Sequence, residues 1–329
     1  MTPPTLPLAG VHHVSALSAH IARSRDFYTR VLGLRPIIRT VNQDAPSMYH
    51  LFFGDGAGSP GSDMTVFDMP HVVRERRGNN SITRTTFRVA GAATLAWWAA
   101  RLTELGVEHG GIGERDGRGI IDFDDVEGTR LSLVDDGGAG AAHPWGESPV
   151  PAEHQIRGLG YVVITIPVLE PTDRFLREAL GLRPHHSYPV ADAPSFSVHV
   201  YAMGEGGAHA EVHVAVRDDL PASRHGAGGV HHVALRVPGG QGIEKWTSHL
   251  DRLGYRNSGV VDRHYFTSGY VREPNRVLFE LATDGPGFEV DGPLSADRLS
   301  LPPALEPRRA AIESKLAPIT ADRPTGAAT

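Results

Sequence analysis

The sequence of 329 residues contains no cysteine. This absence excludes thiol nucleophiles, disulfide bonds, cysteine-ligated zinc and iron–sulfur clusters. Long apolar runs are also missing, and the most apolar stretch, around residues 161–169, is far too short to span a bilayer. The first ten residues lack the basic and apolar regions of a signal peptide. We therefore expect a cytoplasmic protein that does not enter a membrane.

Clusters of basic residues are absent as well. The 32 Lys and Arg residues are scattered among 38 Asp and Glu residues, and the formal net charge is −6. A nucleic-acid-binding protein is expected to have a basic face, so we predict no nucleic-acid partner. The hydrophobic share of 40% is ample for a buried core, and the length predicts two domains of about 150 residues each.

Two landmarks repeat along the chain with one common offset. The segment FYTRVLGLRP at Phe27–Pro36 resembles FLREALGLRP at Phe175–Pro184, which begins 148 residues later. A Trp-x3-Leu-x2-Leu-Gly pattern begins at Trp98 and again at Trp246, also 148 residues later. Because two independent landmarks share the offset, the two halves of the chain are interpreted as duplicates.

A finer repeat divides each half into two modules, since the Leu-Gly pairs that end the predicted helices recur 73 residues apart. Each module has an apolar opening strand, an amphipathic helix and several short strands. The sequence thus predicts an α+β protein in which four βαβββ modules form two open β-barrel-like domains. The expected first half covers residues 8–136, with modules 8–70 and 80–136, and the second covers 156–284, with modules 156–217 and 228–284.

The remaining segments are expected to connect and extend these halves. Residues 137–155 are rich in Gly, Ala and Pro and are interpreted as a linker. A C-terminal extension of residues 285–329 follows the second half. In it we expect one short helix at Pro307–Leu316 and a disordered end over about the last ten residues.

Three residues form a candidate metal site. The tetrapeptide Val-His-His-Val occurs in the opening strands of the first and fourth modules and contains His13 and His232. Glu280 is a lone carboxylate in the apolar last strand of the fourth module. Each residue alone could be a core group, with Glu280 paired to a nearby arginine. Two histidines at equivalent positions plus one carboxylate, however, match the facial set that leaves Fe(II) open sites for O2 and substrate.

The duplication predicts one such site rather than two. At the 148-residue offset, His13 corresponds to Tyr161, His232 to Arg84 and Glu280 to Ser132. None of these three has the required ligand character. If one metal joins the first and fourth modules, these two must pack together, and the second must pack with the third.

The module pattern resembles the vicinal oxygen chelate superfamily over about residues 10–284. Within it, the chain resembles the hydroquinone ring-cleaving dioxygenases. The matching stretches are GVHHVSALS from Gly10, YHLFFGDGAGSPGSDMT from Tyr49, GVHHVALRV from Gly229, DRHYFTSGYVREPNRVLFELATDGPGF from Asp262 and LPPALEPRR from Leu301.

The resemblance implies specific roles for residues around the metal. It places the iron ligands at His13, His232 and Glu280, with Mn(II) an open alternative because it accepts the same ligands. It places catalytic residues at Arg263, Tyr270 and His231, and substrate contacts at Ser15, His12, Arg263 and Tyr270. Gly269 and Val271 stand where relatives have bulkier apolar residues, which predicts a wider pocket.

The implied reaction is the opening of a small aromatic diol, preferably a hydroquinone, with O2. Three alternatives remain at this point: an extradiol catechol dioxygenase, a glyoxalase-like metal-dependent lyase or isomerase, and a non-catalytic small-molecule-binding protein. A lyase of this type would need a fourth protein ligand late in the first module, and residues 64–67 supply none. The sequence is compatible with a monomer and with a homo-oligomer.

Overall fold

A computed structural model describes residues 7–320. The first module consists of β1 (Val11–Ser18), α1 (Ile21–Asp26), β2 (Arg35–Asn42), β3 (Ala45–Gly54) and β4 (Asp63–Asp68). The second consists of β5 (Ser81–Val89), α2 (Gly91–Glu104), β6 (His109–Arg115), β7 (Arg118–Asp124) and β8 (Arg130–Asp135). The third consists of β9 (Leu159–Ile166), α3 (Leu169–Arg174), β10 (Arg183–Val190), β11 (Ala193–Ala202) and β12 (Glu211–Val216). The fourth consists of β13 (Val230–Val237), α4 (Ile243–Arg252), β14 (Val261–Asp262), β15 (Phe266–Arg272) and β16 (Leu278–Pro286).

The predicted α+β class and the four βαβββ modules are confirmed. The amphipathic helix predicted for the first module is less regular than a continuous α-helix, because α1 continues as a π-helical turn over Phe27–Val31. In this turn the Leu32 N–H reaches back to the Phe27 carbonyl. Gly33 follows with a φ of +70°, so the Leu-Gly pair ends the helix as its sequence predicts.

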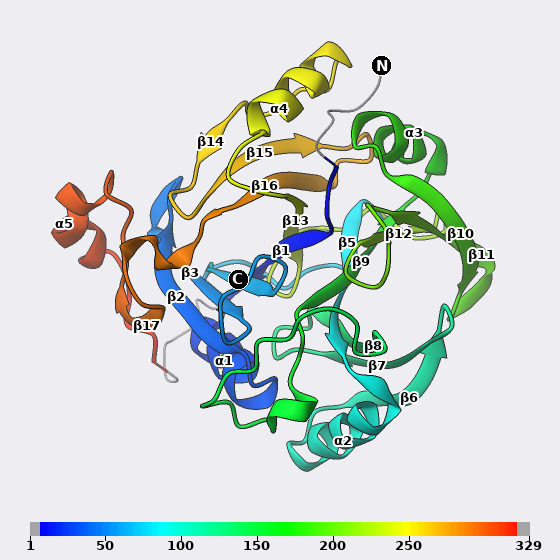
Figure 1. The fold of residues 1–329 in the computed structure, drawn as a ribbon, viewed down its shortest axis with the longest axis horizontal. Coiled ribbons are helices and arrows are strands. Elements are labelled where there is room, and N and C mark those ends of the chain that lie inside the picture. Colours follow the sequence, from blue (N-terminus) through cyan, green and yellow to red (C-terminus); the bar gives the residue numbers. More distant parts are fainter. Residues whose placement is uncertain (1–6, 321–329) are drawn as a thin grey trace.

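The first module pairs with the fourth, and the second with the third, as the metal-site argument predicted. β1 lies antiparallel to β13, and each of these strands is flanked by a parallel strand of its own module, β4 and β16. β5 and β9 pair in the same way, with β8 and β12 outside them. Figure 1 shows the two curved units side by side, with β1 and β13 in one and β5 and β9 in the other. Among the strand ladders within residues 7–320, one register pair, Val230 with Ile82, connects the two units.

The repeated landmarks lie in the core. The side chains of Trp98 and Trp246 are 0% and 1% exposed, and both belong to the same large apolar cluster. Trp98 lies on α2 and Trp246 on α4, and these helices cover equivalent faces of the two units. In duplicated helices the apolar residues at equivalent positions face the core. No helix within residues 7–320 is long and apolar enough to cross a membrane.

The segment between the halves is ordered against the first module. The Ser148 hydroxyl donates to the Gly33 carbonyl at 2.7 Å, and the Gly56 N–H donates to the His143 carbonyl at 2.7 Å. A short 3-10 turn, Ala152–His154, precedes β9.

The C-terminal extension contains more structure than the sequence predicts. A short turn, Phe288–Asp291, leads to the unpredicted strand β17 (Ser295–Leu299), which lies parallel to β2 at the edge of the first unit. The expected helix is present in shorter form, as a 3-10 turn at Glu306–Arg308 followed by α5 (Arg309–Glu313). Most of the segment predicted to be disordered, residues 321–329, lies outside the described residues.

Candidate metal centre

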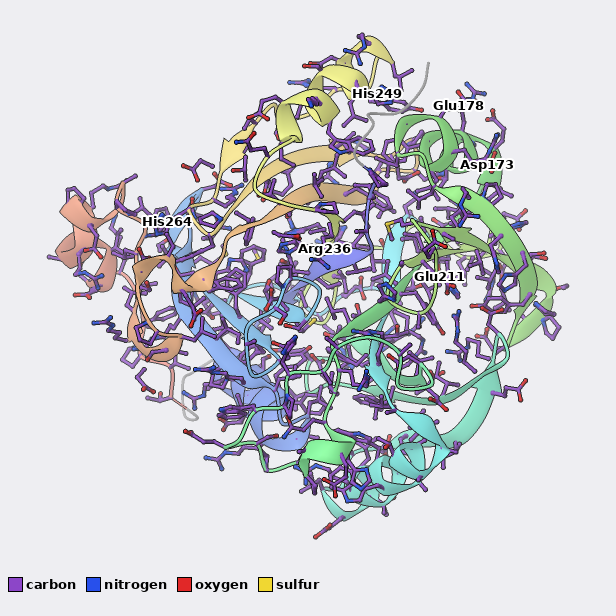
Figure 2. The ribbon with its side chains drawn as sticks, in the orientation of Figure 1. Asp173, Glu178, Glu211, Arg236, His249 and His264 are labelled. Atoms are coloured by element: carbon purple, nitrogen blue, oxygen red, sulfur yellow. The ribbon has the colours of Figure 1, made fainter. Side chains whose placement is uncertain are left out.

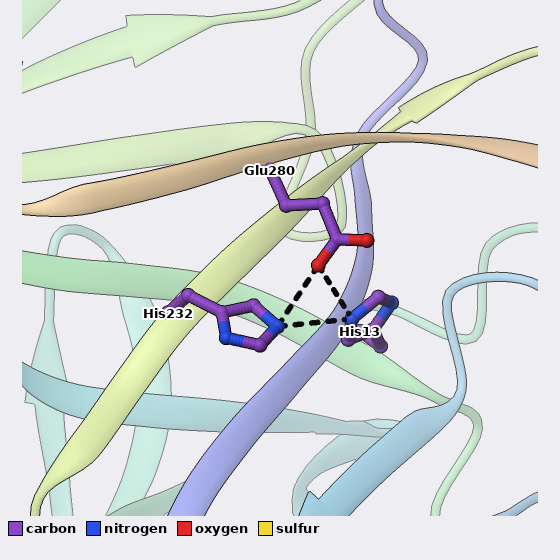
Figure 3. A group of neighbouring side chains, drawn as sticks. All are labelled: His13, His232 and Glu280. Carbon is purple, nitrogen blue, oxygen red and sulfur yellow. Dashed lines mark hydrogen bonds and ion pairs between the residues drawn. The ribbon is translucent and has the colours of Figure 1, made fainter. Parts of the chain in front are cut away.

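The three predicted ligands come together on the concave face of the first unit. In the β1–β13 pair Ser15 lies opposite His232, and in the β13–β16 pair Ala234 lies beside Glu280. His13 Nε2 is 3.2 Å from His232 Nε2, and Glu280 Oε2 is 3.1 Å from the first and 2.9 Å from the second. Figure 3 shows these three atoms facing one another from three different strands.

The charges of this group depend on its burial. The side chains of His13, His232 and Glu280 are at most 5% exposed. Burial alone raises the pKa of Glu280, but the adjacent His13 and His232 outweigh it and hold that pKa well below its usual value. Burial is the main reason why the pKa of His232 is lowered. Glu280 is therefore an anion, as a metal-binding carboxylate must be.

The spacing of the three atoms fits a metal ion bound on one face. Nitrogen and oxygen ligands lie about 2.0–2.2 Å from a divalent metal, so two ligands at right angles are about 3 Å apart. The observed separations of 2.9–3.2 Å match that value. The Ser268 hydroxyl donates to the other oxygen of Glu280, Oε1, so that Oε2 alone points at the imidazoles. The residues present thus fit the implied metal.

His12 fixes the tautomer of His13. A register shift in β1 between Val11 and His13 turns both histidine rings to the same side, and His12 Nδ1 lies 3.0 Å from His13 Nδ1. His12 Nε2 lies 3.1 Å from the Thr283 carbonyl, which can only accept, so this nitrogen is the donor. Burial, and next the charge of His13, lower the pKa of His12 to about 3, so its ring is neutral. His13 must then donate from Nδ1, which leaves its Nε2 lone pair for the metal.

His231 repeats this arrangement beside the other ligand. Its Nδ1 lies 2.8 Å from His232 Nδ1, so each Val-His-His-Val motif supplies one candidate ligand and one imidazole that contacts it. Ser15 also contacts His232, since its hydroxyl is 3.1 Å from His232 Nε2 and 2.7 Å from the Thr65 hydroxyl. His231 lines the adjacent pocket, whereas His12 and Ser15 do not, and they touch only ligands and scaffold. The predicted substrate contacts of His12 and Ser15 therefore gain no support from the geometry.

The triad lines a pocket with about 580 Å³ of empty volume, part of it continuous with solvent. Arg263 and Tyr270 form one wall, as predicted: Arg263 Nε donates to the Tyr270 hydroxyl at 3.1 Å, and its Nη2 contacts Asp44 at 2.8 Å. Burial, followed by the charge of Glu280, raises the pKa of Tyr270 well above its usual value, so the phenol stays protonated. The pocket thus offers a fixed cation and a neutral hydroxyl donor beside the metal ligands.

Sequence reasoning missed His50 and the aromatic walls. His50 lies between the rings of Phe52 and Phe67, each with a centroid 4.1 Å away, and its Nε2 contacts the Thr65 hydroxyl at 2.8 Å. Burial, and next the charge of His13, lower the pKa of His50 well below its usual value. The signal was present, because His50 and Phe52 alternate along β3 and share one face. Phe266 completes the aromatic lining.

The predicted widening of the pocket at Gly269 and Val271 is wrong. A Cβ added to Gly269 would meet Thr247 at 3.0 Å and Ile243 at 3.3 Å, so this position faces α4. Val271 is 1% exposed and does not line the pocket. Both residues lie on the core side of β15, because alternate strand residues point to opposite faces.

Comparison with known proteins establishes the class. The model of the Glyoxalase/Bleomycin resistance protein/Dioxygenase superfamily matches residues 10–133 and again residues 158–281. The chain therefore belongs to this superfamily, and the two matched segments are the two halves of the duplication. Glyoxalase I from Zea mays shares the fold, with a TM-score of 0.62 at 14% identity over 84% of this chain and 92% of that one.

Several relatives have names that refer to ring cleavage. "Putative ring-cleaving dioxygenase MhqA" of Bacillus subtilis (strain 168) is 46% identical over 313 residues, which cover 94% of this chain and 98% of that protein. A "Chlorohydroquinone/hydroquinone 1,2-dioxygenase" of Sphingobium indicum is 30% identical over 82% of this chain and 84% of its own length. A crystal structure of a "putative dioxygenase" from Bacillus subtilis superposes with a TM-score of 0.86, at 31% identity over 97% of this chain and 99% of that one. The predicted resemblance is confirmed.

Proposed function

We propose that this protein is an Fe(II)-dependent dioxygenase that opens the ring of a hydroquinone-type diol with O2. The observation that carries the proposal is the one-sided triad of His13, His232 and Glu280, with ligand atoms 2.9–3.2 Å apart in the lining of an aromatic pocket. A metal bound there would supply open sites at which a diol oxygen and O2 are held side by side. Mn(II) would fit the same donor atoms.

The pocket residues match a para-diol better than a catechol. The two oxygens of a para-diol lie on opposite sides of the ring and cannot both reach one metal, so protein groups must hold the ring. The Arg263 guanidinium and the Tyr270 hydroxyl lie on the wall next to Glu280 and can donate to a phenolate oxygen. The relative named for hydroquinone cleavage supports the same substrate class.

His231 is proposed to carry a proton. It is the one supporting imidazole that lines the pocket as well as contacting a ligand, through its 2.8 Å approach to His232. Because its Nδ1 accepts from the His232 Nδ1–H, its Nε2 carries a hydrogen, which it can donate to an oxygen of the bound diol or of the opened ring. The aromatic walls at Phe52, Phe67 and Phe266 exclude water around the ring.

Among the described residues, the site lacks the fourth ligand that a glyoxalase-like lyase requires. On β4, Thr65 occupies the position that faces the ligands, and its hydroxyl is engaged by Ser15 and His50. The metal-ligating group contains His13, His232 and Glu280 alone within residues 7–320. Oxygen chemistry is therefore favoured over lyase chemistry.

The test is an oxygen-electrode assay of the anaerobically iron-loaded protein with substituted hydroquinones and catechols. We expect O2 uptake with hydroquinones, faster than with catechols, and loss of uptake in Glu280→Ala. Tyr161→Phe is the matched control, because Tyr161 occupies the equivalent of the His13 position in the other unit. O2 uptake that is absent with every diol, or unchanged in Glu280→Ala, would contradict the proposal.

A further inference from the structure

The second unit repeats the scaffold of the metal centre with different side chains. Its strands β9, β12, β5 and β8 pair in the same order and directions as β1, β4, β13 and β16. Tyr161 and Arg84 stand where the first unit has His13 and His232. Arg84 Nη1 donates to the Ser132 hydroxyl at 3.0 Å, and Ser132 stands where the first unit has Glu280. A cation that belongs to the protein thus occupies a place equivalent to the metal centre.

This unit also has an open pocket with about 1100 Å³ of empty volume, part of it continuous with solvent. Five of its lining side chains are arginines, namely Arg77, Arg84, Arg115, Arg130 and Arg217. One apolar wall of the same pocket is formed by Val163, Val190, Val198 and Ala215. Guanidinium groups beside an apolar surface can bind an anion that also has a planar apolar part.

The arginines of this pocket differ in how their side chains are paired. Arg77 contacts Asp124 at 2.5 Å, and Arg217 contacts Asp219 at 2.7 Å. Arg84 and Arg115 share one partner, Asp122, with N–O distances of 3.1 Å and 2.5 Å. The side chain of Arg130 has no hydrogen bond or close ion pair in the described part of the chain, although Asp124, Glu75 and Asp192 lie near enough to interact with its charge. Burial, and next the charge of Arg77, lower the pKa of Arg130. The hydrogen-bond donors of the Arg130 guanidinium are therefore available to a ligand.

A metal ion is not the expected occupant of this unit. Asp116, Glu211 and His213 do lie within reach of one another behind the pocket. However, Arg118 donates to both oxygens of Glu211, at 2.7 Å and 2.8 Å, and this pair already neutralises the carboxylate. Figure 2 labels Glu211, which lies on β12 in the second unit. The acidic cluster therefore serves as a counter-charge.

We propose that the arginine-lined pocket of the second unit binds a small organic carboxylate with a flat unsaturated body. A guanidinium donates two parallel hydrogen bonds to a carboxylate and stacks on a planar group, and the valine wall contacts the apolar part. Arg130 is the main binding residue, because its guanidinium can bind the carboxylate without first breaking a hydrogen bond to another side chain. This site is independent of the proposed ring-opening activity.

The test is calorimetric titration of the full, metal-loaded protein with benzoate, with acetate and inorganic phosphate as comparison anions. We expect benzoate to bind more tightly than acetate or phosphate. Loss of one charge-assisted hydrogen-bond donor costs about 1.5–3 kcal/mol, so Arg130→Gln should weaken benzoate binding by about tenfold or more. Arg130→Glu should abolish the binding, because it places an anion against the ligand.

Arg256→Gln is the matched control, since Arg256 is exposed in the segment after α4 and lies outside this pocket. The affinity of the Arg256→Gln variant for benzoate should equal that of the unmodified protein. Equal affinities in the Arg130 variants would place benzoate elsewhere, including on the metal, and would overturn the proposal. Phosphate binding as tight as benzoate would overturn it as well, because it would show a general anion site without a role for the apolar wall.

Discussion

Replacing His12 tests whether the buried imidazole positions a ligand or contacts the substrate. In His12→Phe an aromatic ring is kept, but the 3.0 Å contact to His13 Nδ1 and the 3.1 Å contact to the Thr283 carbonyl are both lost. His13 can then turn, and either of its nitrogens can carry the proton. Loss of a residue that supports a metal ligand typically lowers metal affinity 10–100-fold, or about 1.4–2.8 kcal/mol.

The assay is a competition titration of Fe(II) or Mn(II) against a chelator. We expect His12→Phe to lose about 10–100-fold in metal affinity. His12→Asn should recover part of this loss, because its amide oxygen can accept the His13 Nδ1–H. A merely structural role would not be rescued by this smaller, polar side chain, since it fills less of the space that His12 occupies.

The opposite outcome is equally clear. If His12→Phe binds metal as tightly as the unmodified protein, and only the KM for the diol rises, then His12 contacts the substrate. That result would refute the tautomer argument and restore the role that the sequence resemblance implied.

The remaining predictions concern the triad, the pocket wall and acid stability. His13→Ala and Glu280→Ala should sharply lower bound metal, while Tyr161→Phe should leave it unchanged, as measured by elemental analysis; full occupancy in His13→Ala would contradict the triad. Tyr270→Phe should lower kcat/KM for hydroquinones by about 10–1000-fold, the range for losing a positioned donor, and steady-state kinetics showing no change would remove Tyr270 from the reaction. Burial raises the pKa of Glu211, but hydrogen bonds, chiefly from His213, hold it at about 2. Its ionised form therefore stabilises the fold above about pH 4.5, and that contribution is lost as the pH falls toward 2. Urea unfolding at decreasing pH should show a smaller acid loss in Glu211→Gln, and an identical loss would show that Glu211 does not contribute.

The duplication and the candidate metal ligands could be predicted from the sequence, because each depends on local patterns that repeat. The offset shared by the Trp98 and Trp246 segments predicted the two halves, and both tryptophans are buried as repeated core residues should be. His13 and His232 were recognisable because two imidazoles at equivalent positions of apolar strands are costly to bury without a ligand. Even the pairing of the first module with the fourth followed, since one metal must touch residues from both.

What the sequence left open depends on contacts between segments far apart in the chain. The strand β17 forms only because β2 presents a free edge, and a five-residue strand carries little signal of its own. The hydrogen bonds from the Thr283 carbonyl through His12 to His13 depend on a register shift in β1. The periodicity of the sequence does not reveal this shift. The arginine pocket required the packing of the second module against the third, because side chains from both approach one point only in the folded sheet. Local sequence patterns thus predicted which residues form the candidate site. Tertiary contacts determined which side chains they pair with and which of their atoms are protonated.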